Sequence, residues 1–123
     1  MDKKRILVIE DEQQLVKAIK IRLEYSGYEV LIAGDGQEGL DKVCQENPDL
    51  ILLDAMMPKM DGYHVCGSLK ADSRYNKIPI IMLTAKAQEE DKMLGEKVGA
   101  DAYIAKPFDH KILLGKIKKL LTA

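Results

Sequence analysis

The sequence has almost no excess charge and no long apolar run, and these absences exclude several kinds of protein. Its 123 residues carry 19 Lys and Arg against 20 Asp and Glu, a formal net charge of −1. A chain so close to neutral has no overall attraction to DNA or to an anionic membrane. The apolar runs are only a few residues long, which excludes a transmembrane helix, and the N-terminal residues contain no signal-peptide core. We therefore expect a cytoplasmic protein with no direct nucleic-acid or membrane binding.

Cysteine is scarce and unpaired in sequence. Cys44 and Cys66 lie far apart and form no C-x-x-C motif, so neither a zinc site nor a disulfide framework is indicated. We expect two free thiols packed as small apolar groups. At 46% hydrophobic residues the chain can build the core of one ordinary domain without cross-links. No linker or low-complexity tract divides it, so we expect a single domain over residues 1–123.

Short apolar runs alternate with longer amphipathic segments. Each run is nearly unbroken, as expected for strands of a parallel sheet that is buried on both faces. The five runs are Ile6–Ile9, Val30–Ile32, Leu50–Leu53, Ile80–Leu83 and Ala102–Ile104. Helical stripes follow them at Leu15–Leu23, Leu40–Cys44, Tyr63–Leu69, Leu94–Val98 and Ile112–Leu121. Gly27, Asn47-Pro48 and Gly99 are expected to end helices, and Asp109 to cap the last one.

This alternation predicts an α/β fold with right-handed crossovers and helices on both faces of a parallel sheet. Five strands fit a flavodoxin-like doubly wound (βα)5 sandwich with strand order 2-1-3-4-5 better than an eight-stranded barrel or a six-stranded dinucleotide fold. In that order, ligands bind beyond the carboxyl ends of the first and third strands.

Chemically active side chains stand just past those strand ends. Glu10–Glu12 follow the first run, Asp54 ends the third, Thr84 ends the fourth and Lys106 follows the fifth. The two halves of the chain also differ in charge, because residues 1–61 hold 13 acids and 8 bases whereas residues 62–123 hold 7 and 11. We therefore expect an acidic pocket from the first half to meet a lysine from the second.

Three of these acids, Glu10, Asp11 and Asp54, would repel one another strongly. At about 5 Å and an effective dielectric near 20, each ionised pair costs roughly 3 kcal/mol. Protons, solvent or a cation must relieve this repulsion, and a few carboxylates with several waters are the ligands that Mg²⁺ prefers. A carboxylate beside such an ion can act as a nucleophile and form an aspartyl phosphate. A solvated acidic loop without a ligand remains the alternative.

Four segments, "ILVIEDE", "PDLILLDAMMPKMDG", "IPIIMLTA" and "GADAYIAKPF", closely resemble the receiver domain of two-component response regulators, the fold of the chemotaxis regulator CheY. The resemblance covers essentially the whole chain. It implies a signalling switch that accepts a phosphoryl group and assists its own phosphorylation and dephosphorylation, rather than an enzyme. The implied partners are a sensor histidine kinase or phosphotransfer protein and a downstream effector that the sequence does not identify.

The resemblance implies a role for each site residue. Asp54 matches the phosphoacceptor, loaded from a phosphohistidine or a small phosphodonor. Glu10 and Asp11 match the acid pair that binds Mg²⁺, Asp11 directly and Glu10 through water. Asp54 and the backbone carbonyl of Met56 complete the implied metal ligands.

The same resemblance implies a two-state switch. Thr84 matches the switch hydroxyl, Lys106 the phosphoryl-binding lysine, and Tyr103 the aromatic residue that turns inward after phosphorylation. The surface of the fourth helix, last strand and last helix then changes. The bond between Lys106 and Pro107 is implied to be cis. Met56 and Lys86 match positions beside the hydrolytic water, and we hypothesise that apolar Met56 slows self-dephosphorylation.

Other functions fit the residues less well. Residues 34–39 match G-x-G-x-x-G, but they follow the second strand and carry acids, which favours a tight turn at a helix entry. A flavodoxin is disfavoured by the acidic loop after the first strand. A phosphoaspartate-type phosphatase of the haloacid dehalogenase kind lacks its second Asp, because Met56 stands there. A receiver-like binding module that is never phosphorylated is a further alternative. His64 and His110 have no second metal ligand at helical spacing.

Overall fold

The computed structural model describes residues 3–57, 60–85 and 99–122 and forms five strands and four helices within them. The strands are β1 (Arg5–Ile9), β2 (Glu29–Ala33), β3 (Leu50–Asp54), β4 (Ile80–Thr84) and β5 (Ala102–Ala105). The helices are α1 (Gln13–Tyr25), α2 (Gly36–Glu46), α3 (Gly62–Lys70) and α5 (His110–Thr122). Each strand contains its predicted apolar run. The helix predicted at Leu94–Val98 lies outside the described residues.

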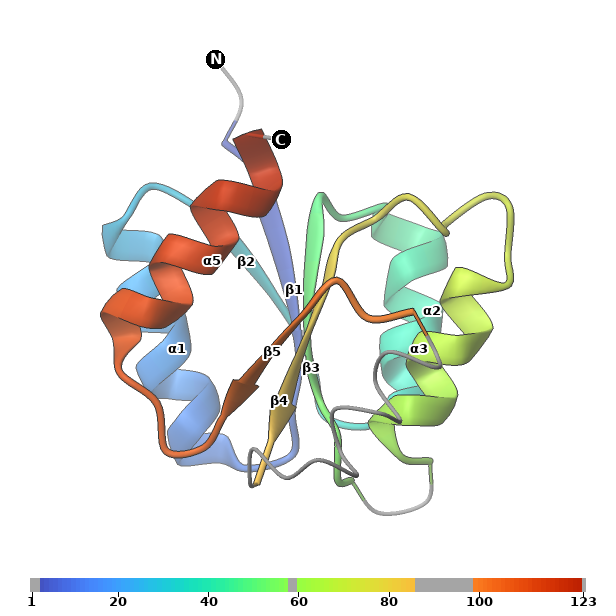
Figure 1. Cartoon of the computed structure of the whole chain (residues 1–123), viewed down its shortest axis with the longest axis horizontal. Helices are drawn as coiled ribbons and strands as arrows, with labels where there is room; N and C mark the ends of the chain where they lie inside the picture. The colour runs from blue at the N-terminus through green and yellow to red at the C-terminus, as the bar shows by residue number, and fades with distance from the viewer. Residues whose placement is uncertain (1–2, 58–59, 86–98, 123) are drawn as a thin grey trace.

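The strands form one parallel sheet in the order β2-β1-β3-β4-β5. Helices α1 and α5 cover one face of the sheet and α2 and α3 cover the other (Figure 1). The predicted flavodoxin-like sandwich is therefore confirmed.

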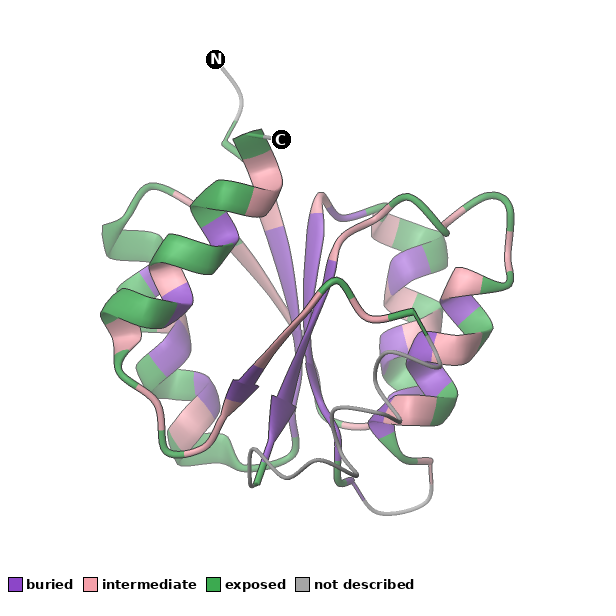
Figure 2. Cartoon of the chain, viewed as in Figure 1, coloured by how far each residue is buried: buried purple, intermediate pink, exposed green. Residues whose placement is uncertain are grey.

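The core has two layers, one on each face of the sheet. Alternate residues of one strand point to opposite faces, so Leu7 and Ile9 pack with α2 and α3 while Ile6 and Val8 pack with α1 and α5. The central strands β3 and β4 are buried along their whole length, whereas the edge strands β2 and β5 are only partly buried (Figure 2). The expectation of burial on both faces therefore holds for the three inner strands β1, β3 and β4, since β1 is also buried from Ile6 to Ile9.

Three helix boundaries follow the predicted signals. Gly27 has a φ of 95° just after α1, a conformation that glycine adopts without steric cost. Asn47 adopts the left-handed conformation directly before Pro48 and ends α2. The carboxylate of Asp109 accepts a hydrogen bond from the Lys111 amide at 2.8 Å, which is the geometry of a helix N-cap.

The G-x-G-x-x-G segment has a packing role. Asp35 caps α2 by accepting a hydrogen bond from the Glu38 amide. A Cβ on Gly36 would lie 2.9 Å from the Val65 side chain, and one on Gly39 would lie 2.5 Å from Ile9. The small residues therefore let α2 approach α3 and the sheet closely. The segment follows the edge strand β2, as the sequence predicted.

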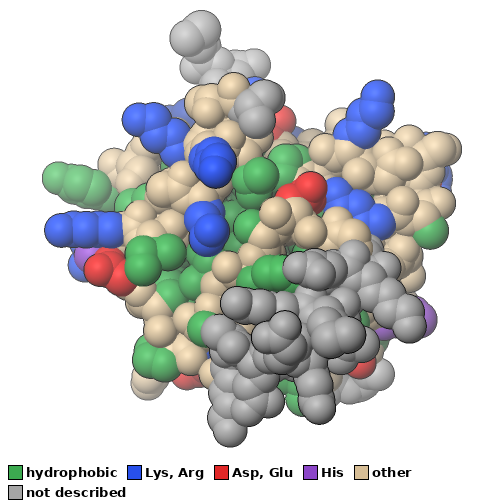
Figure 3. Space-filling model, in the orientation of Figure 1, with side chains coloured by type: hydrophobic (Ala, Val, Ile, Leu, Met, Phe, Trp, Pro, Cys, Tyr) green, Lys and Arg blue, Asp and Glu red, His purple; other side chains and the backbone are tan. Residues whose placement is uncertain are grey.

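The outer face of α5 is basic and exposed. Lys and Arg side chains stand over this helix in Figure 3, and the exposed lysines of α5 are Lys111, Lys116, Lys118 and Lys119. None of the helices within the described parts of the chain has the length and apolar content needed to cross a bilayer. Neither cysteine forms a disulfide within the described residues. Cys66 is buried as expected, but Cys44 is exposed, contrary to the expectation that both pack as apolar groups.

Candidate phosphoacceptor and metal site

The strand register gathers the predicted side chains at the carboxyl edge of the sheet. Ile9 pairs with Leu53, so the next residues, Glu10 and Asp54, lie side by side. Thr84 pairs with Ala105, which places Lys106 directly after the neighbouring strand end. Because all five strands are parallel, these residues share one edge.

Three carboxylates form a cluster at this edge. Each of Glu10, Asp11 and Asp54 offers a carboxylate oxygen, and these oxygens lie within 4.8 Å of one another. Glu10 and Asp54 are 2% and 4% exposed, whereas Asp11 is exposed. At this separation the estimated repulsion of roughly 3 kcal/mol for each ionised pair applies, so the cluster needs a positive partner.

Lys106 supplies part of that positive charge. Its Nζ donates to Glu10 Oε1 at 2.7 Å and lies 3.2 Å from Asp54 Oδ1. Partial burial lowers the pKa of Lys106, but the hydrogen bond to Glu10 and the charge of Asp54 outweigh that effect and raise the pKa above its ordinary value. The lysine is therefore protonated at neutral pH, and the predicted meeting of an acidic pocket with a lysine from the second half is confirmed.

Backbone groups orient the two buried carboxylates. The Met56 amide donates to Asp54 Oδ1 at 3.2 Å, and the Glu12 amide donates to Glu10 Oε2 at 3.1 Å. Both oxygens of Glu10 therefore have a donor, and Oδ1 of Asp54 lies near two, yet the carboxylates keep lone pairs available. Such partial satisfaction is typical of carboxylates that also bind a cation.

Gly62 is a site residue that the sequence analysis missed. A Cβ at this position would lie 2.1 Å from the backbone oxygen of Asp54, so only glycine lets α3 begin this close to the end of β3. The Gly62 amide donates to the Ala55 carbonyl at 3.0 Å, and Asp61 caps the helix through the His64 amide. A glycine directly after a capping Asp was the available signal.

The remaining predicted residues lie around the cluster. Thr84 is 3% exposed, and its carbonyl accepts a hydrogen bond from the Lys106 amide. Tyr103 is half-buried and packs against the core layer of α2 and α3. The Met56 side chain is 68% exposed beside Asp54, the bond between Lys106 and Pro107 is cis, and Lys86 lies outside the described residues.

The donor set fits a hard divalent cation. All three acidic groups offer oxygen, and the exposed Asp11 leaves an opening to solvent. Lys106, the one lysine that meets the cluster within the described residues, cannot neutralise three carboxylates. Oxygen ligands with room for several waters are what Mg²⁺ requires. An edge of this kind can hold a metal ion beside a carboxylate that has an oxygen free for chemistry.

The fold and this edge define a class: a flavodoxin-like sandwich with a cluster of acids, able to hold a cation, at the switch point of its sheet. The chain belongs to the response regulator receiver domain family, whose model matches residues 6–118. A receiver domain protein (CheY-like) from Methanospirillum hungatei superposes with a TM-score of 0.92 at 36% identity, covering 98% of this chain and 95% of that one.

Two further relatives bear on function. The alkaline phosphatase synthesis transcriptional regulatory protein PhoP of Bacillus subtilis is 47% identical over 118 residues, 96% of this chain and 48% of that protein. This chain thus spans about half the length of that relative. The receiver domain of the sensor histidine kinase PA1611 from Pseudomonas aeruginosa, solved with a magnesium ion in its active-site cleft, has a TM-score of 0.91 at 29% identity, covering 99% of this chain and all of that one.

Proposed function

We propose that this receiver domain is a phosphorylation-activated switch in which Asp54 accepts a phosphoryl group from a phosphohistidine of a sensor kinase or phosphotransfer protein. The observation that carries the proposal is the position of Asp54: it is buried beside Glu10 and Asp11 and in contact with Lys106, at the edge where ligands bind in this fold. A structural ion pair would not need three acids for one lysine.

The transfer needs only positioning and charge neutralisation. An oxygen of the Asp54 carboxylate attacks phosphorus, the new O–P bond forms and the P–N bond to the imidazole breaks. The bonding electron pair stays on the imidazole nitrogen. The ring leaves as neutral imidazole when its other nitrogen is protonated, and otherwise it takes a proton from solvent. The Met56 amide holds Asp54 Oδ1 during this step, and Lys106, already 3.2 Å from that oxygen, is placed to contact the incoming phosphoryl oxygens.

Glu10, Asp11, Asp54 and the Met56 carbonyl would hold Mg²⁺, by resemblance to the family and in keeping with the oxygen-rich cluster. When bound, the ion supplies positive charge to the phosphoryl oxygens. The magnesium in the cleft of the PA1611 receiver domain supports the same choice of metal here.

The switch itself would use Thr84 and Tyr103. A hydrogen bond from the Thr84 hydroxyl to the phosphoryl group would draw Thr84 toward Asp54, and Tyr103 would turn into the vacated space. One charge-assisted hydrogen bond contributes roughly 1.5–3 kcal/mol, whereas moving a population from mostly inactive to mostly active takes about 5.5 kcal/mol. The contacts of Lys106 must therefore contribute as well, and the changed surface would include β5 and α5.

Incubation with a small phosphodonor tests the assignment. With acetyl phosphate and Mg²⁺, we expect intact-mass spectrometry to find one alkali-labile phosphoryl group on the wild-type chain and none on Asp54→Asn. Asp11→Asn should load only poorly, because it loses a metal ligand. Equal labelling of the Asp54→Asn chain would contradict the proposal.

The same experiment separates the alternatives. A phosphatase of outside substrates would consume the donor continuously, and a binding module would neither consume it nor gain mass. We favour the switch over the phosphatase because the exposed Met56 stands where that enzyme needs a second Asp. For this chain itself we propose no nucleic-acid contact, because its net charge is −1 and gives no overall attraction to DNA. About half of the transcriptional relative PhoP lies outside the region that matches this chain.

A further inference from the structure

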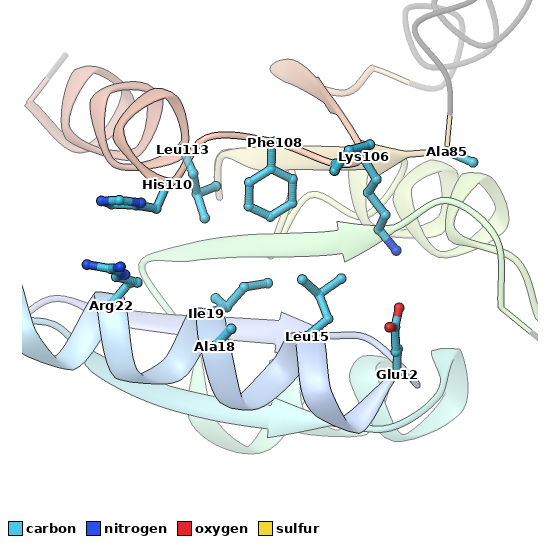
Figure 4. Close-up of a pocket in the computed structure, with 11 residues that line it drawn as sticks. Glu12, Leu15, Ala18, Ile19, Arg22, Ala85, Lys106, Phe108, His110 and Leu113 are labelled. Carbon is cyan, nitrogen blue, oxygen red and sulfur yellow. The ribbon is translucent and has the colours of Figure 1, made fainter.

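A cavity of about 500 Å³ opens between α1 and the segment from Lys106 to Leu113. It is separate from the carboxylate cluster, although Lys106 borders both. Its walls are mostly apolar, and Figure 4 shows Leu15, Ile19, Phe108 and Leu113 around one common space. A volume in the range of 300–1,000 Å³ with apolar walls and a few polar groups is typical of small-molecule sites.

The two ends of this cavity differ in charge. Arg22 and His110 lie together at one end, and Glu12 and Lys106 at the other (Figure 4). Glu12 directly precedes α1 and Arg22 lies ten residues further along the helix. At 1.5 Å per residue, the cavity is about 15 Å long.

The Arg22 end is the one that favours an anion. Throughout residues 3–57, 60–85 and 99–122, no hydrogen bond or ion pair engages the Arg22 guanidinium. His110 has only the distant carboxylate of Asp109, at 3.8 Å. A guanidinium presents a fork of donors that matches a carboxylate.

The opposite end repels an anion. The ammonium of Lys106 is already shared by Glu10 and Asp54, and Glu12 adds a further negative charge there. A ligand with one charged group would therefore place an anionic head at Arg22 and an apolar tail toward Leu15.

We propose that this cavity binds a free amphipathic carboxylate, with the carboxylate on Arg22 and His110 and an unbranched or aromatic apolar body along α1. The site is distinct from the phosphoacceptor, and the unphosphorylated chain, which has this cavity, is expected to bind the ligand. Its ligand class follows from the unpartnered arginine at one end, the apolar walls and the negative charge at the other end.

Titration of the isotopically labelled full chain with straight-chain carboxylates tests this site. Octanoate, nonanoate and decanoate should give saturable amide shifts confined to residues 12–22 and 106–113, with binding about fourfold tighter for each added methylene. Uncharged 1-octanol should bind more weakly than octanoate, and octylammonium should bind least. Equal binding of octylammonium and octanoate, or shifts that do not saturate, would overturn the proposal.

Two variants separate the head from the tail. Arg22→Gln should weaken octanoate about tenfold and leave 1-octanol unchanged, whereas Ala18→Leu, which places a larger side chain on the cavity wall, should weaken both. Arg74→Gln removes an exposed arginine outside the cavity and should change neither. Thermal melting checks that each variant is folded; if Ala18→Leu is not, the Arg22→Gln comparison still decides, because an unchanged octanoate affinity in that variant rejects the site.

Discussion

Lys106 contacts two carboxylates at once, and this shared contact explains how a buried acidic edge can exist in the resting protein. The ammonium lies 2.7 Å from Glu10 and 3.2 Å from Asp54, so one positive charge offsets part of the repulsion among three acids. Because Glu10 holds the lysine independently of Asp54, the lysine stays in place when the charge on Asp54 changes. A phosphoryl group on Asp54 would therefore find its cation already positioned.

Met56 is the residue that we expect to set the lifetime of the phosphorylated state. Its exposed thioether beside Asp54 offers a hydrolytic water no strong hydrogen bond. Met56→Asn should shorten the half-life of the phosphorylated chain about tenfold, the effect of one hydrogen bond worth about 1.4 kcal/mol. The decay of phosphoprotein after removal of the donor measures this.

Met56→Leu is the matched control, because it changes the side chain without adding a polar group. Its decay should equal that of the wild type. If Met56→Asn decays no faster than Met56→Leu, the hypothesis on Met56 is wrong.

Cys66 gives the folded chain a pH dependence in the alkaline range. Burial raises the pKa of its thiol from 9.0 to about 11. Between these values the unfolded chain has released the thiol proton and the native chain still holds it, so the free energy of unfolding falls as pH rises. The full effect of two pKa units is about 2.7 kcal/mol, of which about 1.7 kcal/mol should be lost between pH 8.5 and 10.5. Urea unfolding at these two pH values measures this loss.

Other groups titrate in this range, so variants isolate the contribution of Cys66. The decline should be smaller in Cys66→Ala, whatever its stability at pH 8.5, and unchanged in Cys44→Ala, because Cys44 is exposed. An equal decline in Cys66→Ala and the wild type would assign the effect to other residues.

Among the elements, α3 depends most directly on one residue. Its first residue, Gly62, faces the backbone of Asp54, where a Cβ would lie 2.1 Å from the carbonyl oxygen. In the middle of α5, by contrast, a Cβ on Gly115 would meet nothing within 4 Å. Replacement by alanine should therefore destabilise the chain at position 62 and stabilise it at position 115.

We expect Gly62→Ala to destabilise the chain by about 3 kcal/mol, because the backbone of β3 or α3 must move to admit the methyl group. Gly115→Ala should stabilise it by about 0.5–1 kcal/mol, because alanine loses less backbone entropy in a helix. Chemical denaturation of the two variants measures both effects. A Gly62→Ala chain as stable as the wild type would contradict the close approach.

The ends of helices were predictable from the sequence where one residue favours the conformation of a helix terminus. Asn47 before Pro48, Gly27 and Asp109 stand at their expected helix ends, since these effects act within a few residues. Gly62 was missed because the need for glycine arises from the close approach of α3 to the end of β3. The capping Asp61 before it marks a helix start but does not show which backbone the glycine will face.

On the scale of the whole molecule, carboxylates that repel one another lie together at one edge of the sheet, and a bound divalent cation should reduce this repulsion. We expect Mg²⁺ to stabilise the native chain by RT ln(1 + [Mg²⁺]/Kd), which is about 1.4 kcal/mol when the Mg²⁺ concentration is about ten times Kd. The stabilisation should appear as a rise in melting temperature. The reason is the cluster of Glu10, Asp11 and Asp54, whose oxygens lie within 4.8 Å.

Asp11→Ala should remove most of this magnesium effect, because it deletes the exposed ligand while leaving the buried pair intact. Asp35→Ala, which removes an acid that is not part of the cluster, should leave the magnesium effect in place and lower only the basal stability through loss of the α2 cap. A magnesium effect that persists fully in Asp11→Ala would place the cation elsewhere.

The local pattern of the chain was enough to predict the strands, their parallel pairing and the order of the sheet, because buried strands and amphipathic helices have different hydrophobic periods and crossovers have one hand. It was also enough to predict that Glu10, Asp54, Thr84 and Lys106 meet at one edge. The tertiary structure alone decided that Lys106 lies closer to Glu10 than to Asp54 and that position 62 needs a glycine. It alone also decided that Arg22 and His110 lie together at one end of a cavity. These features depend on distances between separate elements of the fold, and those distances are set by packing rather than by any local periodicity.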